Sequence, residues 1–291
     1  MAGACSRARR LAKLLAAAPL LAAALAAPVA AKPVELSQQA LDAFERQVRL
    51  TEARVDQELG RGTGFLWMDT QSETKRRAAY AELRQGQVVI ERLETLVDGE
   101  SIKCPHGLIH HWVGVIFVPG ATLEQTLRLV EDYDHHADYY KPDVTRSKIL
   151  EHHGNDYKVY LRFYRRKILT VVLDTEHEVH YFPMDATHAY SRSYSTRVTE
   201  VENPGKPDES QKPVGKDGGF LWRINTYWRF LERDGGTYVQ CESVSLTRDI
   251  PPGLGWLLNG LVSSIPRESL TQTLTATRNA LARKSTAFAA R

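Results

Sequence analysis

The sequence TVVLDTEHEVHYF at residues 170–182 decides what fold we expect for this chain. Apolar or aromatic residues recur at every second position, and carboxylates occupy several of the positions between them. This period of two predicts a β-strand at 168–182 with one face toward a core and the other toward water. The set expected to face the interior is Leu169, Val171, Leu173, Thr175, Val179 and Tyr181. The set expected to face water is Asp174, Glu176 and Glu178.

Similar alternation surrounds this strand and predicts further strands at 144–152, 156–164, 187–201, 219–232 and 236–249. Short links rich in Gly, Asn, Asp or Pro join most of them, which favours antiparallel neighbours. Residues 203–219, rich in Pro, Gly, Lys and Asp, are instead expected to form a mobile surface loop. The same parity predicts further inward-facing side chains: Tyr157, Val159, Leu161, Phe163, Phe220, Trp222, Ile224, Trp228 and Phe230.

Helical patterns flank these strands. An amphipathic helix is predicted at 35–59 and a short charged helix at 74–84. Further along, we expect strands near 88–93 and 108–118, a helix at 122–132 and a short one up to Lys141-Pro142. At the C-terminal end, a short apolar helix is expected at 255–258. A separate long helix is predicted from Pro266, in its first turn, to Arg283, with Leu270, Leu274 and Leu281 on one side.

Residues 1–31 are expected to be a cleaved secretory signal peptide. A basic segment precedes an apolar run at 14–27 that is shorter than a membrane-spanning helix requires. The small residues Val29 and Ala31 place the cleavage site before Lys32. Cleavage removes four basic residues and no acidic one, so the formal net charge changes from +3 to −1. The mature chain then lacks the basic charge that nucleic-acid binding requires, and we expect it to be secreted or periplasmic.

This order of elements, a strand, two helices, consecutive antiparallel strands and a long terminal helix, resembles the START-like (SRPBCC, helix-grip) superfamily. The segments most similar to secreted bacterial proteins of that type are GVIFVPGATLEQTLRLVEDYDHH at 114–136, TVVLDTEHEVHYF, YSRSYSTRVTEVENPG at 190–205 and YVQCESVSLTRDIPPGLGWLLNG at 238–260. The resemblance implies an α+β fold in which a curved antiparallel sheet wraps the C-terminal helix. The expected organisation is a signal peptide at 1–31, a helical extension at 32–85, a START-like domain at 86–285 and a tail at 286–291.

A curved sheet that grips one helix leaves an apolar space, so we expect a hydrophobic-ligand pocket. His177 on the inward face is favoured as a core histidine and is otherwise a polar anchor for the ligand. Arg192 and Glu242 form a buried pair that orients a ligand head group if their faces point inward, and are surface charges if they point outward. Parity leaves both alternatives open. The candidate ligand-binding residues are His177, Tyr190, Arg192, Tyr194, Trp222, Trp228 and Glu242.

No catalytic motif is present in the sequence, and metal signals are weak. His177 and His180 do not have the spacing of a zinc motif, because positions three apart on a strand face opposite ways. The residues Asp132, His135 and His136 have helical spacing but lack an evident fourth ligand. We therefore predict no metal or cofactor. Cys104 and Cys241 could pair in an oxidising compartment, although two buried thiols are the favoured interpretation.

The predicted function is binding, and possible carriage, of a hydrophobic small molecule or lipid. One alternative is a cyclase- or hydrolase-type enzyme with His177, Arg192 and Glu242 as acid–base or orienting groups. Another alternative is a protein-docking module formed by residues 35–85. A further hypothesis is transient membrane-surface contact through the basic turn at 165–167 and the apolar segment at 256–258. The sequence leaves the ligand and the oligomeric state open.

Overall fold

The computed structural model describes residues 34–60, 64–166, 170–250 and 255–289, and in the last helix the side chains of 264–284. The predicted signal peptide, the tip of the basic turn at Lys167 and the side chains at 256–258 lie outside the described residues. Residues 33–291 form one compact unit. Among the helices of the described residues, none has both the length and the apolarity needed to cross a bilayer.

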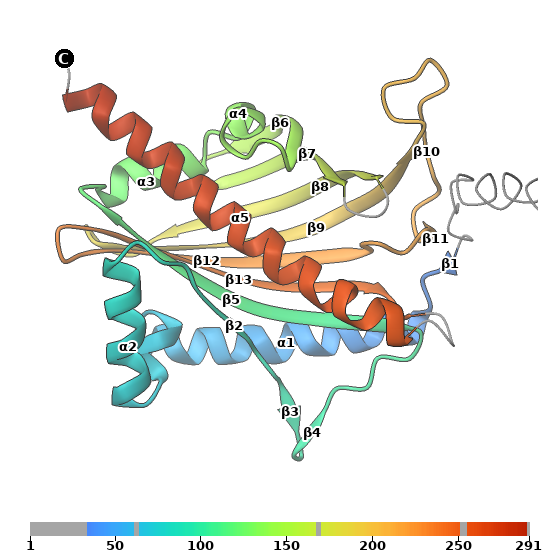
Figure 1. The fold of residues 1–291 in the computed structure, drawn as a ribbon, viewed down its shortest axis with the longest axis horizontal. Coiled ribbons are helices and arrows are strands. Elements are labelled where there is room, and N and C mark those ends of the chain that lie inside the picture. The colour runs from blue at the N-terminus through green and yellow to red at the C-terminus, as the bar shows by residue number, and fades with distance from the viewer. Residues whose placement is uncertain (1–33, 61–63, 167–169, 251–254, 290–291) are drawn as a thin grey trace, which may run out of the picture. The chain divides into compact units, whose positions relative to one another are not determined.

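The centre of the fold is a nine-stranded antiparallel sheet with the order β2-β5-β13-β12-β9-β8-β7-β6, in which β10 pairs with β9 (Figure 1). The long strands are β5 (Gly107–Pro119), β6 (Val144–His153), β7 (Asp156–Arg166), β8 (Thr170–Pro183), β9 (His188–Glu202), β12 (Arg223–Arg233) and β13 (Gly236–Arg248). The short ones are β2 (Val89–Arg92) and β10 (Ser210–Gln211). Together with the helix α5 (Gly255–Ala289), which packs across one face, the sheet confirms the predicted α+β, helix-grip class.

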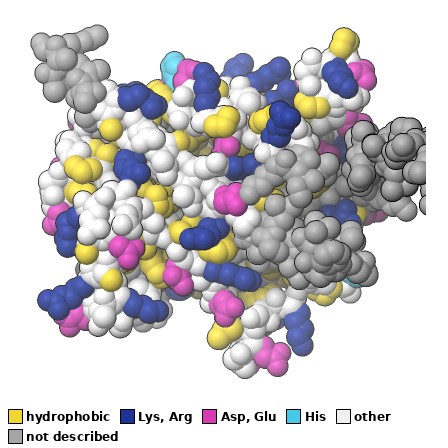
Figure 2. All heavy atoms as spheres, in the orientation of Figure 1, with side chains coloured by type: hydrophobic (Ala, Val, Ile, Leu, Met, Phe, Trp, Pro, Cys, Tyr) yellow, Lys and Arg dark blue, Asp and Glu magenta, His cyan; other side chains and the backbone are white. Residues whose placement is uncertain are grey.

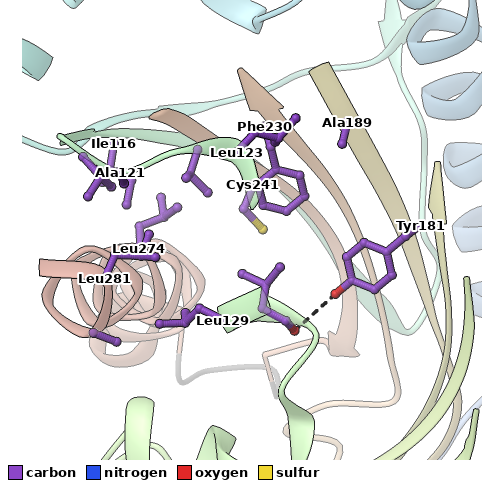
Figure 3. Packing of buried hydrophobic residues seen from close by; sticks show 14 of the residues in the cluster. Ile116, Ala121, Leu123, Leu129, Tyr181, Ala189, Phe230, Cys241, Leu274 and Leu281 are labelled. Atoms are coloured by element: carbon purple, nitrogen blue, oxygen red, sulfur yellow. Dashed lines mark hydrogen bonds between the residues drawn. The ribbon is translucent and has the colours of Figure 1, made fainter. Parts of the chain in front are cut away.

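Helix α5 packs closely on Gly114 of β5. A side chain at this position would place its Cβ 2.5 Å from Leu274 Cδ1, so the glycine makes room for the leucine side chains of α5. Leu274 and Leu281 point from α5 toward Ile116 of β5 (Figure 3), and these side chains belong to one buried cluster. We refer to this side of the sheet as the α5 face. The prediction of two C-terminal helices is wrong, because Pro266 lies inside the single helix α5 rather than in a first turn.

Between β5 and β6, the helix α3 (Leu123–Val130) begins at Thr122, which caps it as predicted. The Thr122 Oγ1 accepts a hydrogen bond from the Gln125 amide at 3.2 Å, and Gln125 Oε1 accepts one from the Thr122 amide at 3.1 Å. A short 3₁₀ segment η2 (Tyr133–His135) and the helix α4 (His136–Tyr139) follow. These elements bring apolar side chains over the α5 face beside the helix, where Leu129 of α3 is fully buried.

The opposite side of the sheet is also covered. The helix α1 (Gln38–Gly60), the 3₁₀ segment η1 (Trp67–Thr70) and the helix α2 (Glu73–Arg84) pack against it, and we refer to this side as the α1 face. Ala40 and Phe44 of α1 lie in a buried cluster with Val244 and Leu246 of β13. The sheet is therefore buried on both faces along much of its length, whereas a strand with one wet face was expected.

Residues 203–219, predicted to be a mobile surface loop, consist mostly of exposed turns with two short strands. Besides β10, they contain β11 (Lys216–Asp217), which pairs with β1 (Val34–Glu35). A hairpin of β3 (Leu96–Val97) and β4 (Glu100–Ser101) was likewise not predicted. The side chains of Glu209 and Gln211 reach Arg162 and Asp174 on the α1 face. Asp174, expected to face water, is therefore buried beneath this segment.

Candidate functional site

Strand register divides the predicted site residues between the two faces. Side chains of cross-strand partners lie on the same face of a sheet. His177 is opposite Val159, and Trp228 is opposite Cys241. Val159 and Cys241 belong to the buried cluster that contains Leu274 of α5. His177 and Trp228 therefore lie on the α5 face, as the period of two predicted.

The α5 face changes character along the strands. Ile116 and Phe230, which pack in the cluster around α5, have no exposed surface. Trp112, Phe163 and Trp228 share the same face but are only half-buried. The residues between them on β9 are small: Ala189, Ser191, Ser193 and Ser195. This part of the α5 face combines aromatic surface with small neighbours, which is the composition of an apolar ligand site.

His177 is a buried, titratable group on this face. Its Nε2 lies 2.9 Å from Thr175 Oγ1, and the edge of its ring faces Phe163 at a centroid distance of 6.5 Å. Burial lowers the pKa of His177 to about 4, so the imidazole is neutral at pH 7. A neutral imidazole bonded to a hydroxyl is the satisfied core histidine favoured above, and it presents little charge to a ligand.

Tyrosine hydroxyls on the same face are paired within the protein. The hydroxyl of Tyr181 lies 2.8 Å from that of Tyr133 and donates to the Val130 carbonyl at 3.2 Å (Figure 3). The Nε2 of His136 is 3.0 Å from the same carbonyl, and burial lowers the pKa of His136 to about 4. These contacts tie α3 and α4 to β8.

The other predicted residues lie on the α1 face. Tyr190, Arg192 and Tyr194 of β9 alternate with the serines that face α5. Glu242 of β13 follows Cys241 and points the opposite way. Neither alternative for Arg192 and Glu242 holds, since they neither line the α5 face nor form ordinary surface charges. Each is paired with a residue of α1.

Trp222 corrects a parity prediction. Expected to face inward with Trp228, it lies instead in the cluster of Ala40 and Phe44 on the α1 face. Its Nε1 donates to Asp217 Oδ1 at 3.1 Å. Strand β12 begins only at Arg223, so the strict alternation does not extend back to Trp222, and Phe220 is exposed.

Buried and half-buried charges connect α1 to the sheet. Glu242 accepts hydrogen bonds on Oε1 from Arg54 and from His111, whose Nε2 lies 2.6 Å away. Burial alone would raise the pKa of Glu242, but the hydrogen bond from His111 and the charge of Arg54 outweigh it and hold the pKa below its usual range. Arg229 of β12 donates to Glu58 Oε2 at 2.6 Å. This network holds α1 in place.

Further contacts of α1 use the tyrosines and the arginine of β9. Glu52 accepts hydrogen bonds from the hydroxyls of Tyr194 at 2.8 Å and Tyr227 at 3.0 Å. Arg192 pairs with Asp56, and its guanidinium also lies 5.9 Å from the ring centroid of Tyr190. The polar side of α1 therefore meets a polar sheet face, and this surface of α1 is occupied by its own chain.

The proposed acid–base set of His177, Arg192 and Glu242 does not converge. His177 lies on the α5 face, whereas Arg192 and Glu242 lie on the α1 face with the sheet between them. One substrate cannot contact all three. Sequence reasoning missed Trp112, because β5 is apolar on both faces and its period of two is hidden. Gly114 was the remaining signal in the sequence. It lies two residues after Trp112, so the two share a face of β5, and α5 packs against Gly114.

Other candidate sites also separate. His135 is exposed and its Nδ1 lies 2.6 Å from Asp132, while His136 is buried and turned toward Val130. Across the described part of the chain, no three His, Cys, Asp or Glu side chains group in a way that could hold a metal ion. Cys104 and Cys241 are free thiols in different clusters on opposite faces of the sheet.

Comparisons with known proteins complete this description. No protein-family model matches the chain, and no curated protein matches it in sequence. Among solved structures, a Thermus thermophilus protein aligns with a TM-score of 0.43 and 18% identity over 60% of this chain and 97% of its own. A STAR-related lipid transfer protein of Xanthomonas axonopodis aligns with a TM-score of 0.42 and 17% identity over 66% of this chain and 98% of its own.

The Zhui aromatase/cyclase of Streptomyces aligns with a TM-score of 0.43 and 11% identity over 61% of this chain and 96% of its own. A protein of Mycobacterium smegmatis described as a START superfamily protein and human STARD10 also align, each with a TM-score of 0.39. These likenesses concern the fold alone, and the helix-grip architecture is established by this chain's own sheet and its terminal helix.

Proposed function

We propose that this protein binds a hydrophobic small molecule or lipid between the α5 face of the sheet and α5, and shields it from water. The observation that carries the proposal is the half-buried aromatic surface of Trp112, Phe163 and Trp228 on the same face as the fully buried cluster around α5. Burying such surface against an apolar ligand is worth about 25 cal/mol per Å². The neighbouring side chains of β9 on this face are small.

The ligand we propose is largely apolar and carries few polar groups. His177 is neutral and already bonded to Thr175, and the hydroxyls of Tyr133 and Tyr181 bond to each other. A buried charge on the ligand would need a partner that these residues do not supply. The predicted signal peptide supports the further proposal that this binding takes place outside the cytoplasm.

Mass spectrometry of the denatured mature protein tests the proposal directly. We expect an apolar molecule to copurify with the protein and to be released on unfolding. A protein that is free of ligand and cannot be loaded with fatty acids, sterols or aromatic compounds would contradict the proposal.

Tryptophan quenching locates the ligand. A brominated fatty acid quenches tryptophans only in near contact, so its effect should come from Trp112 and Trp228. We expect the double substitution Trp112→Phe with Trp228→Phe to remove most of the quenching. Trp222→Phe is the matched control, because Trp222 is buried on the α1 face. Loss of quenching in the control, with quenching retained in the double variant, would place the ligand elsewhere.

A further inference from the structure

A second feature, remote from the α5 face, is a pocket rich in arginine. It has a volume of about 340 Å³ and lies where α2 meets the turn between β12 and β13. In Figure 2, Lys and Arg side chains lie among acidic ones in the region that α2 occupies at the lower left of Figure 1. The residues that line the pocket are Arg76, Arg77, Tyr80, Arg84, Arg233 and Asp234.

Local structure explains why these arginines are close together. Residues four apart lie on one side of a helix, so Arg76, Tyr80 and Arg84 form a row along α2. Tyr80 and the neighbouring Leu83 are buried against the sheet, which fixes the rotation of the helix. The row therefore faces the β12–β13 turn, from which Arg233 approaches.

Arg233 is held in position by two aromatic rings. Its guanidinium lies 5.1 Å from the ring centroid of Tyr80 and 5.4 Å from that of Tyr238. The two rings themselves meet edge to face at a centroid distance of 5.4 Å. Cation–π contacts of this kind orient a guanidinium and reduce the conformational entropy that it loses on binding a ligand.

The positive charge of the pocket is not balanced by its own acids. Asp234 is the one carboxylate of the lining, and its Oδ2 lies 3.7 Å from Arg233 Nε while accepting a hydrogen bond from Tyr238. Glu73 outside the lining lies 3.6 Å from Arg77, but both side chains are highly exposed, and such pairs are weak. The lining thus carries four guanidinium groups and one carboxylate. Beyond the lining, Asp69 accepts a hydrogen bond from the Tyr80 hydroxyl at 2.5 Å, and its charge acts on Arg233. The lining itself keeps a surplus of positive charge, which favours an anion.

We propose that this arginine pocket binds a phosphate-bearing ligand. Guanidinium groups bind phosphate oxygens in bidentate fashion, and several of them around one pocket select a ligand with more than one negative charge. The volume of the pocket corresponds to roughly ten water molecules, which is enough for a phosphate group and part of the molecule that carries it. The site is independent of the hydrophobic ligand proposed above.

Phosphate of this kind comes either from a soluble compound or from a phospholipid head group, and two titrations of the mature protein distinguish them. Calorimetry with pyrophosphate at low ionic strength tests the soluble source. Cosedimentation with phosphatidylcholine vesicles, with and without phosphatidate, tests the membrane source. We expect saturable binding in at least one titration, weakened by added salt. Absence of binding in both would overturn the proposal.

Substitutions decide whether the pocket itself binds. A lost charge-assisted hydrogen bond costs about 1.5–3 kcal/mol, so Arg76→Gln or Arg84→Gln should weaken binding by about tenfold or more. Lys75→Gln is the matched control, since Lys75 lies on the same helix, carries the same charge and is outside the lining. Both arginines are exposed, so the variants should fold. An equal loss in the Lys75 variant would show diffuse charge attraction and overturn the proposal.

Discussion

His111 of β5 and Glu242 of β13 lie side by side on the α1 face, with His111 Nε2 2.6 Å from Glu242 Oε1. Glu242 has no exposed surface, and Arg54 of α1 binds the same oxygen. On the other side of the imidazole, Nδ1 lies 3.1 Å from Gln47 Nε2. The two residues thus link the sheet to α1 through a continuous chain of polar contacts.

Replacing Glu242 by Gln should destabilise the protein strongly. The change removes one of the two carboxylates that pair with Arg54, whose Nη1 keeps its 2.8 Å contact with Glu58, and it weakens the charge-assisted hydrogen bonds at the buried position 242, which typically costs about 1.5–3 kcal/mol. Urea unfolding measures the loss. The exposed pair of Glu73 and Arg77 supplies the control, and Glu73→Gln should change stability by less than about 1 kcal/mol. Equal effects of the two changes would argue that the buried network contributes little.

Stability should fall as the pH drops from about 6.5 toward 4. Burial lowers the pKa of His110, His136 and His177 from 6.5 to about 4 each, with the charge of Arg92 adding to the effect at His110. In this window the unfolded chain binds protons that the folded protein does not. The free energy of unfolding therefore increases with pH across this window. Acidification from pH 6.5 to 4 should lower it by on the order of 2 kcal/mol per histidine.

Substitution of His177 isolates one of these contributions. His177→Met should make the dependence of unfolding free energy on pH shallower between pH 4 and 6.5. Val179→Ala, on the same strand and face, should lower stability by a similar amount at every pH because it removes no titrating group. A slope that is unchanged by His177→Met would contradict the assignment.

Gly114→Ala should destabilise the contact between β5 and α5. The added Cβ would lie 2.5 Å from Leu274 Cδ1 and 3.3 Å from Leu270 Cγ, so these buried leucine side chains must repack, at a cost of about 1–3 kcal/mol. Combining it with Leu274→Ala should cost less than the sum of the two single changes. Gly60→Ala is the control, because a Cβ there meets no atom within 4 Å.

Asp174→Ala should release residues 203–215 from the sheet. Asp174 receives two hydrogen bonds from Arg162, at 2.7 and 2.8 Å, and one from Gln211 at 2.7 Å. Without the carboxylate, Arg162 and Gln211 lose their shared partner. Hydrogen–deuterium exchange should then accelerate in this segment, while Glu178→Ala, exposed on the same strand and the same face, should leave it unchanged.

Much of the secondary structure was predictable because local patterns determine it. Alternation at 156–164 and 236–249 corresponds to β7 and β13 within two residues at each end. The helix at 74–84 was likewise correct within one residue. On β8, the charged positions identified the α5 face, so His177 could be placed from sequence.

Parity failed where both faces of a strand are buried. On β9 one face carries serines and the other carries Tyr190, Arg192 and Tyr194. Neither set indicates from sequence which face is exposed to solvent. The helix that covers the second of these faces is α1, and its polar residues have the pattern of a solvent-exposed helix surface. Arg54 and Glu242 are 188 residues apart, and no local pattern records that two charged surfaces so distant in the chain will meet.

Burial of the sheet on both faces has a consequence for how the chain tolerates change. In a strand with one wet side, every second position accepts almost any polar residue. In β12 and β13, Trp228 and Cys241 belong to the α5 side, while Tyr227 and Glu242 belong to the α1 side. Successive residues of these strands therefore pack on opposite faces, against different helices, and each is constrained by its own contacts. A saturation scan should find few permissive positions there, and a chain shortened to begin at residue 86 should expose Trp222 and its neighbours and aggregate.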